Sequence, residues 1–252
     1  MIARHAPLLL AYAALILFAL LLPGSAHAQS VSIDLGAAGQ AGATSRLVQI
    51  TALFTVLSLA PSLLVMVTAF TRIVIVLSLL RSAIGAQGTP PNPVIIGLAL
   101  FLTFFVMQPV MQQAWDAGLL PMAQGHVAEL DGLQLAAEPF RKFMAANLRG
   151  SDAQLFLDIG NIAPPATPEQ MPWRALIPAF MVGELRRAFE IGFLLYLPFL
   201  VIDMVVGSVL MSLGMMMLPP SAVSLPFKLI FFVMMDGWRL VAGSLVQGFA
   251  PG

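Results

Sequence analysis

The amino-acid sequence predicts an all-α membrane protein: a cleaved signal peptide, then two helical hairpins (four apolar helices) flanking a small helical soluble domain. Composition gives the first indication, because 59% of the 252 residues are apolar and only 10% are charged, against about 25% charged in a typical soluble domain. Too few polar side chains remain to cover a surface in water. The other two indications are long apolar runs and the acidic segment between them.

The first 28 residues have the order of a secretory signal peptide. Arg4 and His5 form a basic start, Leu8 to Leu22 is apolar, and Ala26-His27-Ala28 supplies the small residues of a cleavage site. We expect cleavage after Ala28. The alternative is an uncleaved anchor helix, but the apolar core is shorter than the ~20 residues that a span needs.

The first hairpin is expected over residues 47–111, after a flexible Gly- and Ala-rich leader at 29–46. Residues 47–70 are long enough to cross a hydrocarbon layer of about 30 Å, and the apolar run resumes at 73–80. Gly and Pro residues indicate a turn at 85–93. The second apolar run covers 94–111.

Residues 112–172 differ in kind, since acidic side chains outnumber basic ones and proline gathers at the end. We expect a soluble, mostly helical domain and linker with one amphipathic helix at 138–148. The second hairpin follows over 173–252, with apolar runs at 185–218 and 227–249 on either side of Pro219-Pro220. An external start places the soluble domain outside and the basic turns inside, as the positive-inside rule expects.

Charged residues lie within or beside the apolar runs, where each costs at least ~2.5–3.5 kcal/mol if it faces lipid. They are Arg72, Glu184, Arg186, Arg187, Glu190, Asp203, Lys228, Asp236 and Arg239. Some can pair three or four residues apart on their own helix. These pairs are Arg186 with Glu190, Glu184 with Arg187, and Asp236 with Arg239.

Asp203 and Lys228 have no opposite charge within one helical turn. Because a single tight turn joins their helices, we expect the two to pair, within one subunit or between neighbours. The alternative for Lys228 is to extend toward the membrane interface, which Asp203 cannot do. Helices carrying such charges must be covered by protein, so the sequence predicts an oligomer.

Met215, Met216 and Met217 stand together before Pro219-Pro220. Methionine is flexible and apolar, so it packs well in irregular cores and can also seal a gap that opens and closes. Three in succession cannot all face one way on a helix. Either they surround a packed helix or the helix ends and they form a loop, and the neighbouring Gly214 favours the loop.

Several motifs resemble the FliP family of flagellar biosynthetic proteins. They are Ala69-Phe-Thr-Arg-Ile-Val-Ile-Val-Leu-Ser-Leu-Leu-Arg81, Pro178-Ala-Phe180, Glu184-Leu185, Ala188-Phe-Glu-Ile-Gly-Phe193, Leu197-Pro-Phe199, Ile202-Asp203, Gly214-Met-Met-Met-Leu-Pro-Pro220, Leu225-Pro-Phe-Lys-Leu229 and Asp236-Gly-Trp238. The resemblance covers most of residues 47–249. It is weakest over 112–172, and Val182-Gly183 stands where the family is expected to have hydroxyl residues.

The resemblance implies a core, pore-forming subunit of the flagellar type III protein export gate in the bacterial inner membrane, with a periplasmic domain at the flagellar basal body. Its implied partners are further FliP copies, five in all, with FliQ, FliR, FlhB and FlhA, and its cargo is unfolded flagellar protein. By the same resemblance, Met215, Met216 and Met217 form a methionine gasket that closes the pore. Asp203 and Lys228 match a charged pair important to the family.

An enzyme is not expected, and no cofactor is implied. Cysteine is absent, and two of the three histidines, His5 and His27, belong to the signal peptide. The sequence shows no phosphate-binding glycine loop and no nucleophile with its base. The alternative function is a small-solute or ion transporter that uses Asp203 and Asp236 to bind cargo or relay protons.

Overall fold

The computed structural model describes residues 65–86, 88–215 and 217–249, and before them only residues 51, 54, 55, 58 and 62. The chain divides into two units, residues 1–55 and 56–252, and the helices below belong to the second. The predicted signal peptide, its cleavage after Ala28, the leader at 29–46 and most of the run at 47–70 lie outside the described residues. The described residues are predominantly helical, with no strand among them.

The helices α3 (Phe70–Ile84) and α4 (Asn92–Ala114) form a hairpin, and the turn between them lies close to the predicted turn at 85–93. Gly85 follows α3 with φ of 76°, and its amide bonds the carbonyl of Arg81, as expected where glycine ends a helix. The second helix is longer than predicted. A π-helical turn, η2 (Trp115–Leu119), and α5 (Leu120–Ala123) carry it to residue 123.

Residues 124–172 hold α6 (Glu129–Ala146), α7 (Gly150–Ile159) and the short η3 (Pro168–Gln170). The helix expected at 138–148 begins much earlier, since Glu129 and Asp131 favour a helix N-terminus and Pro139 is accommodated within it. Met144 and Leu157 pack against the start of the next helix. This segment therefore shares its core with the second hairpin.

The second hairpin consists of α8 (Trp173–Ser212), α9 (Pro220–Met234) and α10 (Gly237–Gln247). The single apolar helix expected at 227–249 is wrong, because α9 and α10 meet at a bend of 61°. Asp236 takes a left-handed conformation with φ of 51°, which Asp adopts more readily than most residues. At Gly237 any Cβ would collide with the ring of Phe232.

Two helical stretches among the described residues are long and apolar enough to cross a membrane, Asn92–Ala123 and Trp173–Ser212. The bent pair α9–α10 makes a third if it counts as one span. The first of the four predicted apolar helices falls mainly at 47–64, outside the described residues. The 15-residue α3 rises only about 22 Å and is shorter than a bilayer requires.

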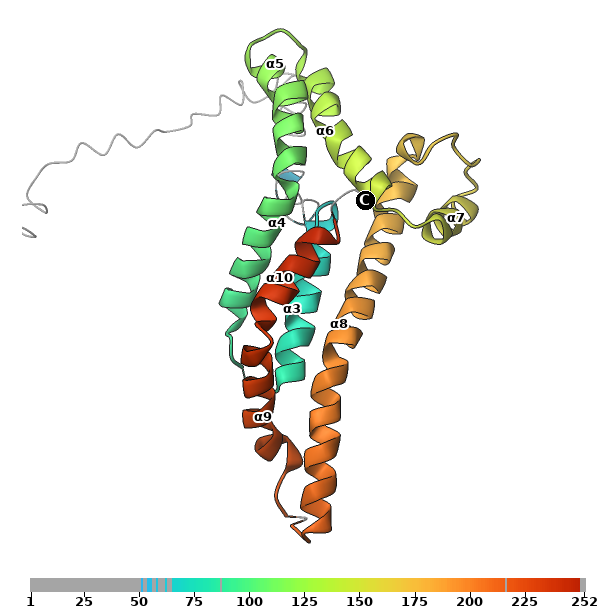
Figure 1. Cartoon of the computed structure of the whole chain (residues 1–252). Coiled ribbons are helices and arrows are strands. Elements are labelled where there is room, and N and C mark those ends of the chain that lie inside the picture. Colours follow the sequence, from blue (N-terminus) through green and yellow to red (C-terminus); the bar gives the residue numbers. More distant parts are fainter. Residues whose placement is uncertain are drawn as a thin grey trace, which may run out of the picture. The chain divides into compact units, whose positions relative to one another are not determined.

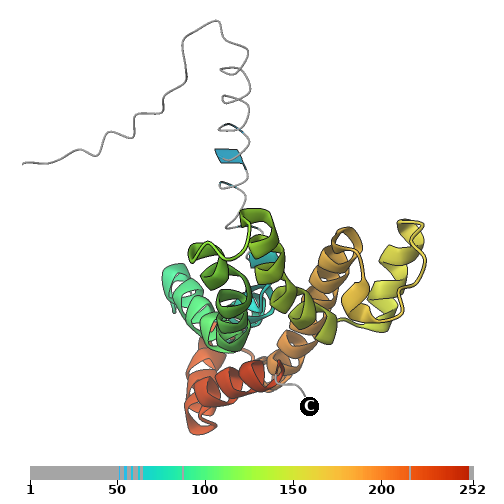
Figure 2. The same cartoon turned by 90° about the horizontal axis from the view of Figure 1, so that it is seen from above.

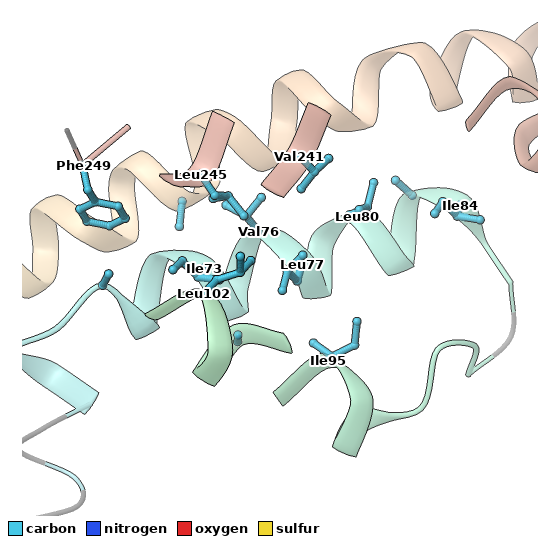
Figure 3. Packing of buried hydrophobic residues seen from close by; sticks show 14 of the residues in the cluster. Ile73, Val76, Leu77, Leu80, Ile84, Ile95, Leu102, Val241, Leu245 and Phe249 are labelled. Carbon is cyan, nitrogen blue, oxygen red and sulfur yellow. The ribbon is translucent and has the colours of Figure 1, made fainter. Parts of the chain in front are cut away.

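The core is built around α3, which contacts α4, α8 and α9 (Figures 1 and 2). Ile73, Val76, Leu77 and Leu80 repeat at helical spacing and are fully buried. Figure 3 shows them between Leu102 of α4 and the side chains of α10. Toward the other end of the unit, α7 packs on the N-terminal part of α8.

Candidate functional site

The long helix α8 carries two carboxylates whose partners come from other helices. Glu184 and Asp203 are 19 residues apart, about 28 Å along the helix axis. Each holds a cation that also binds the last carbonyls of another helix. The result is two clusters, named below the Glu184 cluster and the Asp203 cluster.

In the Glu184 cluster, the guanidinium of Arg72 grips both carboxylate oxygens, with Nε 2.7 Å from Oε2. The side chains of Arg72 and Glu184 are only 2% and 0% exposed. A further guanidinium nitrogen donates to the carbonyl of Gly248 at 3.0 Å, and the guanidinium carbon lies 3.5 Å from the ring centroid of Phe249. Arg187 approaches the same carboxylate at 3.6 Å.

This arrangement stabilises the positive charge of Arg72, which its own helix would destabilise. Arg72 lies in the first turn of α3, where the helix dipole repels positive charge. Burying the charge is tolerable because the pairing is bidentate and the remaining donor reaches Gly248, at the C-terminal end of α10 where helix carbonyls lack partners. The Glu184 cluster thus fastens α3, α8 and α10 together.

In the Asp203 cluster, the ammonium of Lys228 lies 2.6 Å from Oδ2 of Asp203. The same nitrogen donates to the carbonyl of Ala83 at 3.0 Å, in the last turn of α3, where a cation favours the dipole. The hydroxyl of Ser224 donates to Oδ1 of Asp203. The structure therefore brings Asp203 and Lys228 together within one chain, and ties α8 and α9 to α3.

Of the other ion pairs that the sequence predicts, two occur and one does not. The pairs Glu184–Arg187 and Asp236–Arg239 occur at 3.6 and 3.9 Å, the second well exposed to solvent. The expected pairing of Arg186 with Glu190 is wrong. Both side chains instead contact α7 and the residue before it. Glu190 pairs with Arg149 at 3.0 Å, and Arg186 lies 3.8 Å from Asp152.

The carboxylate of Asp152 packs against Gly183 of α8. The side chain of Asp152 is buried, and its Oδ2 has no hydrogen-bond partner. A Cβ at position 183 would lie 3.3 Å from that oxygen. Glycine at 183 therefore leaves room for the carboxylate against α8.

Two members of the predicted methionine cluster, Met215 and Met217, lie in a loop. α8 ends at Ser212, Gly214 has φ of 71°, and α9 begins at Pro220. Met217 is 98% exposed and Met215 is also exposed, while Met216 lies outside the described residues. The loop is at the opposite end of α8 from α7 (Figure 1).

Large apolar side chains line the outer faces of α4, α8 and α9. They include Phe101, Phe104 and Phe105 of α4, Phe193, Leu194, Val201, Met204 and Val205 of α8, and Phe227, Ile230, Val233 and Met234 of α9. Patches of this size on a protein mark surfaces that meet lipid or other protein. The Arg72–Glu184 and Lys228–Asp203 pairs thus face the inside of the helix bundle, whereas many large apolar side chains face outward.

Sequence reasoning missed several partners of the charged residues on α8. It left Arg72 without a partner, and it did not single out Ser224, Arg149 or Asp152. Within the part of the chain that the structure describes, no group of His, Asp and Glu side chains is placed to hold a metal ion.

Comparison with known proteins gives the family. The family model described as FliP family matches residues 53–245. A flagellar biosynthetic protein FliP of Caulobacter vibrioides is 55% identical over 233 residues, which cover 92% of this chain and 87% of the relative. Those of Rhizobium meliloti and Bacillus subtilis are 47% and 46% identical, over 96% and 81% of this chain and 100% and 93% of the relatives. The chain is therefore a member of the FliP family.

Proposed function

We propose that this protein is the core pore-forming subunit of the flagellar type III protein export gate, conducting unfolded flagellar proteins across the bacterial inner membrane. Membership of a family whose relatives are named flagellar biosynthetic proteins supports this function. The structural observation that carries it is the apolar outer face of α8 and α9, which runs toward the methionine loop. Several copies side by side would cover those faces and gather their loops around one opening.

The partners proposed are further copies of this chain, five in all, with FliQ, FliR, FlhB and FlhA. The exposed apolar faces of α4, α8 and α9 support an assembled state, because further subunits would cover them. Cleavage after Ala28 and a periplasmic position for residues 112–172 belong to the same proposal. The turn after α3 and the methionine loop lie at one end of the bundle (Figure 1), which suits a common cytoplasmic side.

Met215, Met216 and Met217 are proposed to close the pore. Met215 and Met217 lie outside any helix and expose flexible thioethers, so copies of the loop could interlock and separate without breaking a helix. Replacing all three residues with Ala should make the membrane permeable to small ions while assembly persists. Replacing the exposed Met66, which precedes α3 and lies outside the loop and the outer face of α8, provides the control.

Co-expression with FliQ and FliR, followed by native mass measurement, tests the assembly directly. A complex with several copies of this chain is the expected result. A lone chain that transports a solute in liposomes would favour the alternative, a small-solute or ion transporter. That alternative has less support because both oxygens of Asp203 are already engaged by Lys228 and Ser224.

A further inference from the structure

A cavity of about 710 Å³ opens between α4, α6, α8 and the residues that follow α10. Its volume lies within the range of small-molecule binding sites, about 300–1,000 Å³. It borders the Glu184 cluster through Arg72 and Arg187 but extends beyond it to Lys142 of α6. Neither the charge pairing nor the proposed gate uses this space.

The charges around the cavity leave an excess of positive charge. Arg72 and Arg187 share the single carboxylate of Glu184, and Glu190 is held by Arg149. Among the residues that the structure describes, Glu138 pairs with Arg141, and no ion pair involves Lys142. Two of the four basic groups therefore lack a carboxylate of their own.

The acidic group facing Lys142 from the nearby linker is Glu169. A backbone hydrogen bond, a hydrogen bond from Thr167 and, to a smaller extent, the charge of Lys142 lower the pKa of this carboxyl. Glu169 is exposed and does not line the cavity. Lys142, by contrast, is part of the cavity lining.

Apolar side chains form the rest of the wall, chiefly Val106 and Val110 of α4 and Ile191 of α8. Both α4 and α8 change from apolar to more polar sequence near the cavity. A span of about 20 residues that starts at Asn92 ends near Met111, and in α8 the closely spaced charges from Glu184 to Glu190 give way to an apolar stretch that runs as far as Asp203. The cavity therefore has a cationic part beside an apolar surface that continues along two candidate spans.

We propose that this cavity binds the phosphate of an anionic membrane lipid, with Lys142 and Arg187 beside the phosphate and the acyl chain along Val106, Val110 and Ile191. Basic pockets between membrane helices are suited to anionic head groups. The phosphate alone would satisfy the cations but would leave the apolar wall uncovered. This site goes beyond the proposed export function and does not depend on it.

The full chain, purified in neutral detergent, is incubated with phosphatidylglycerol or with phosphatidylethanolamine, and retained lipid is counted by native mass spectrometry. We expect phosphatidylglycerol to be retained preferentially. Lys142→Gln should weaken its retention about tenfold, as expected for the loss of one hydrogen bond to a charged group. Arg174→Gln, which removes another exposed cation outside the cavity, should leave retention unchanged.

Two further arms separate the possible occupants. Ala146→Phe fills the cavity from α6 and should also reduce retention, whereas inorganic phosphate alone should compete poorly. Equal retention by the native chain and Lys142→Gln would overturn the site. So would full displacement by millimolar phosphate, since the ligand would then be the free ion. Efficient cross-linking of Ala146→Cys to a second copy, with no lipid retained, would assign the cavity to a subunit contact instead.

Discussion

The Glu184 cluster and the Asp203 cluster share one plan, yet only the first is sealed inside the chain. In each, a carboxylate of α8 binds a cation that also donates to a carbonyl at a helix C-terminus: Gly248 for Arg72 and Ala83 for Lys228. Glu184 is 0% exposed, whereas the side chain of Asp203 is 29% exposed. The difference lies in what covers α8 at each level.

At Glu184, the helix is enclosed by α3, by the end of α10 and by the segment around α7. At Asp203, cover comes mainly from α9, and the neighbouring Val201, Met204 and Val205 are exposed. The Glu184 cluster therefore holds the single chain together, while the Asp203 cluster is left partly open at the surface, where the assembly proposed above would cover it. This contrast predicts different responses to substitution.

Glu184→Ala should have the largest effect, because it leaves Arg72 buried without a partner charge. Breaking a buried pair in this way costs about 3–5 kcal/mol. Thermal or SDS unfolding of the purified chain, followed by circular dichroism, measures the loss. Glu184→Gln is the control, since it retains an oxygen acceptor and should be less harmful. A loss no greater than that of Asp203→Ala would contradict the comparison.

Lys228→Ala should cost less in the isolated chain, about 1–3 kcal/mol, since partly exposed Asp203 can recover water. Assembly and motility should suffer more, because water is excluded once subunits meet. Neutralising Asp203 as well should restore part of the loss, and the double-mutant cycle measures the coupling. If the double variant assembles no better than Lys228→Ala, the two charges do not act as a direct pair in the complex.

Ser224→Ala should have a smaller effect still, about 1 kcal/mol, because it removes one donor from Asp203 and leaves the ion pair intact. The hydroxyl is fully buried, so no water replaces it in the folded chain. Ser221→Ala, on the exposed start of α9, is the matched control. Equal unfolding midpoints for these two variants would show that the hydroxyl does not support the cluster.

The sequence was sufficient to predict the pairing of Asp203 with Lys228, because neither residue has a local partner and one turn joins their helices. It was insufficient for Arg72 and Glu184, which are 112 residues apart. Glu184 also had a plausible neighbour in Arg187, so local spacing concealed the distant partner. Arg186 and Glu190 were misassigned for the same reason, since only the packing of α7 on α8 brings Asp152 and Arg149 into range.

Among the helices too, some features could be predicted from the sequence and others could not. The apolar runs in the sequence predict α4 and α8, because a long apolar helix is recognised from its composition over many residues. The break between α9 and α10 depends on Asp236-Gly237, where a left-handed residue precedes a glycine packed against Phe232. Hydropathy is insensitive to such a site, because Met234, Met235 and Trp238 keep the run apolar on both sides.

Arg239→Gln should have the smallest effect and tests how far the comparison extends. Its pair with Asp236 is exposed, with side chains 87% and 66% accessible, and such pairs contribute less than about 1 kcal/mol. In the isolated chain the unfolding midpoint should hardly change. In the assembled complex the result depends on whether α10 is covered. A loss of stability there, absent from the single chain, would show that a neighbouring subunit buries Arg239, and the inward placement of charge would then extend from single chains to the contacts between them.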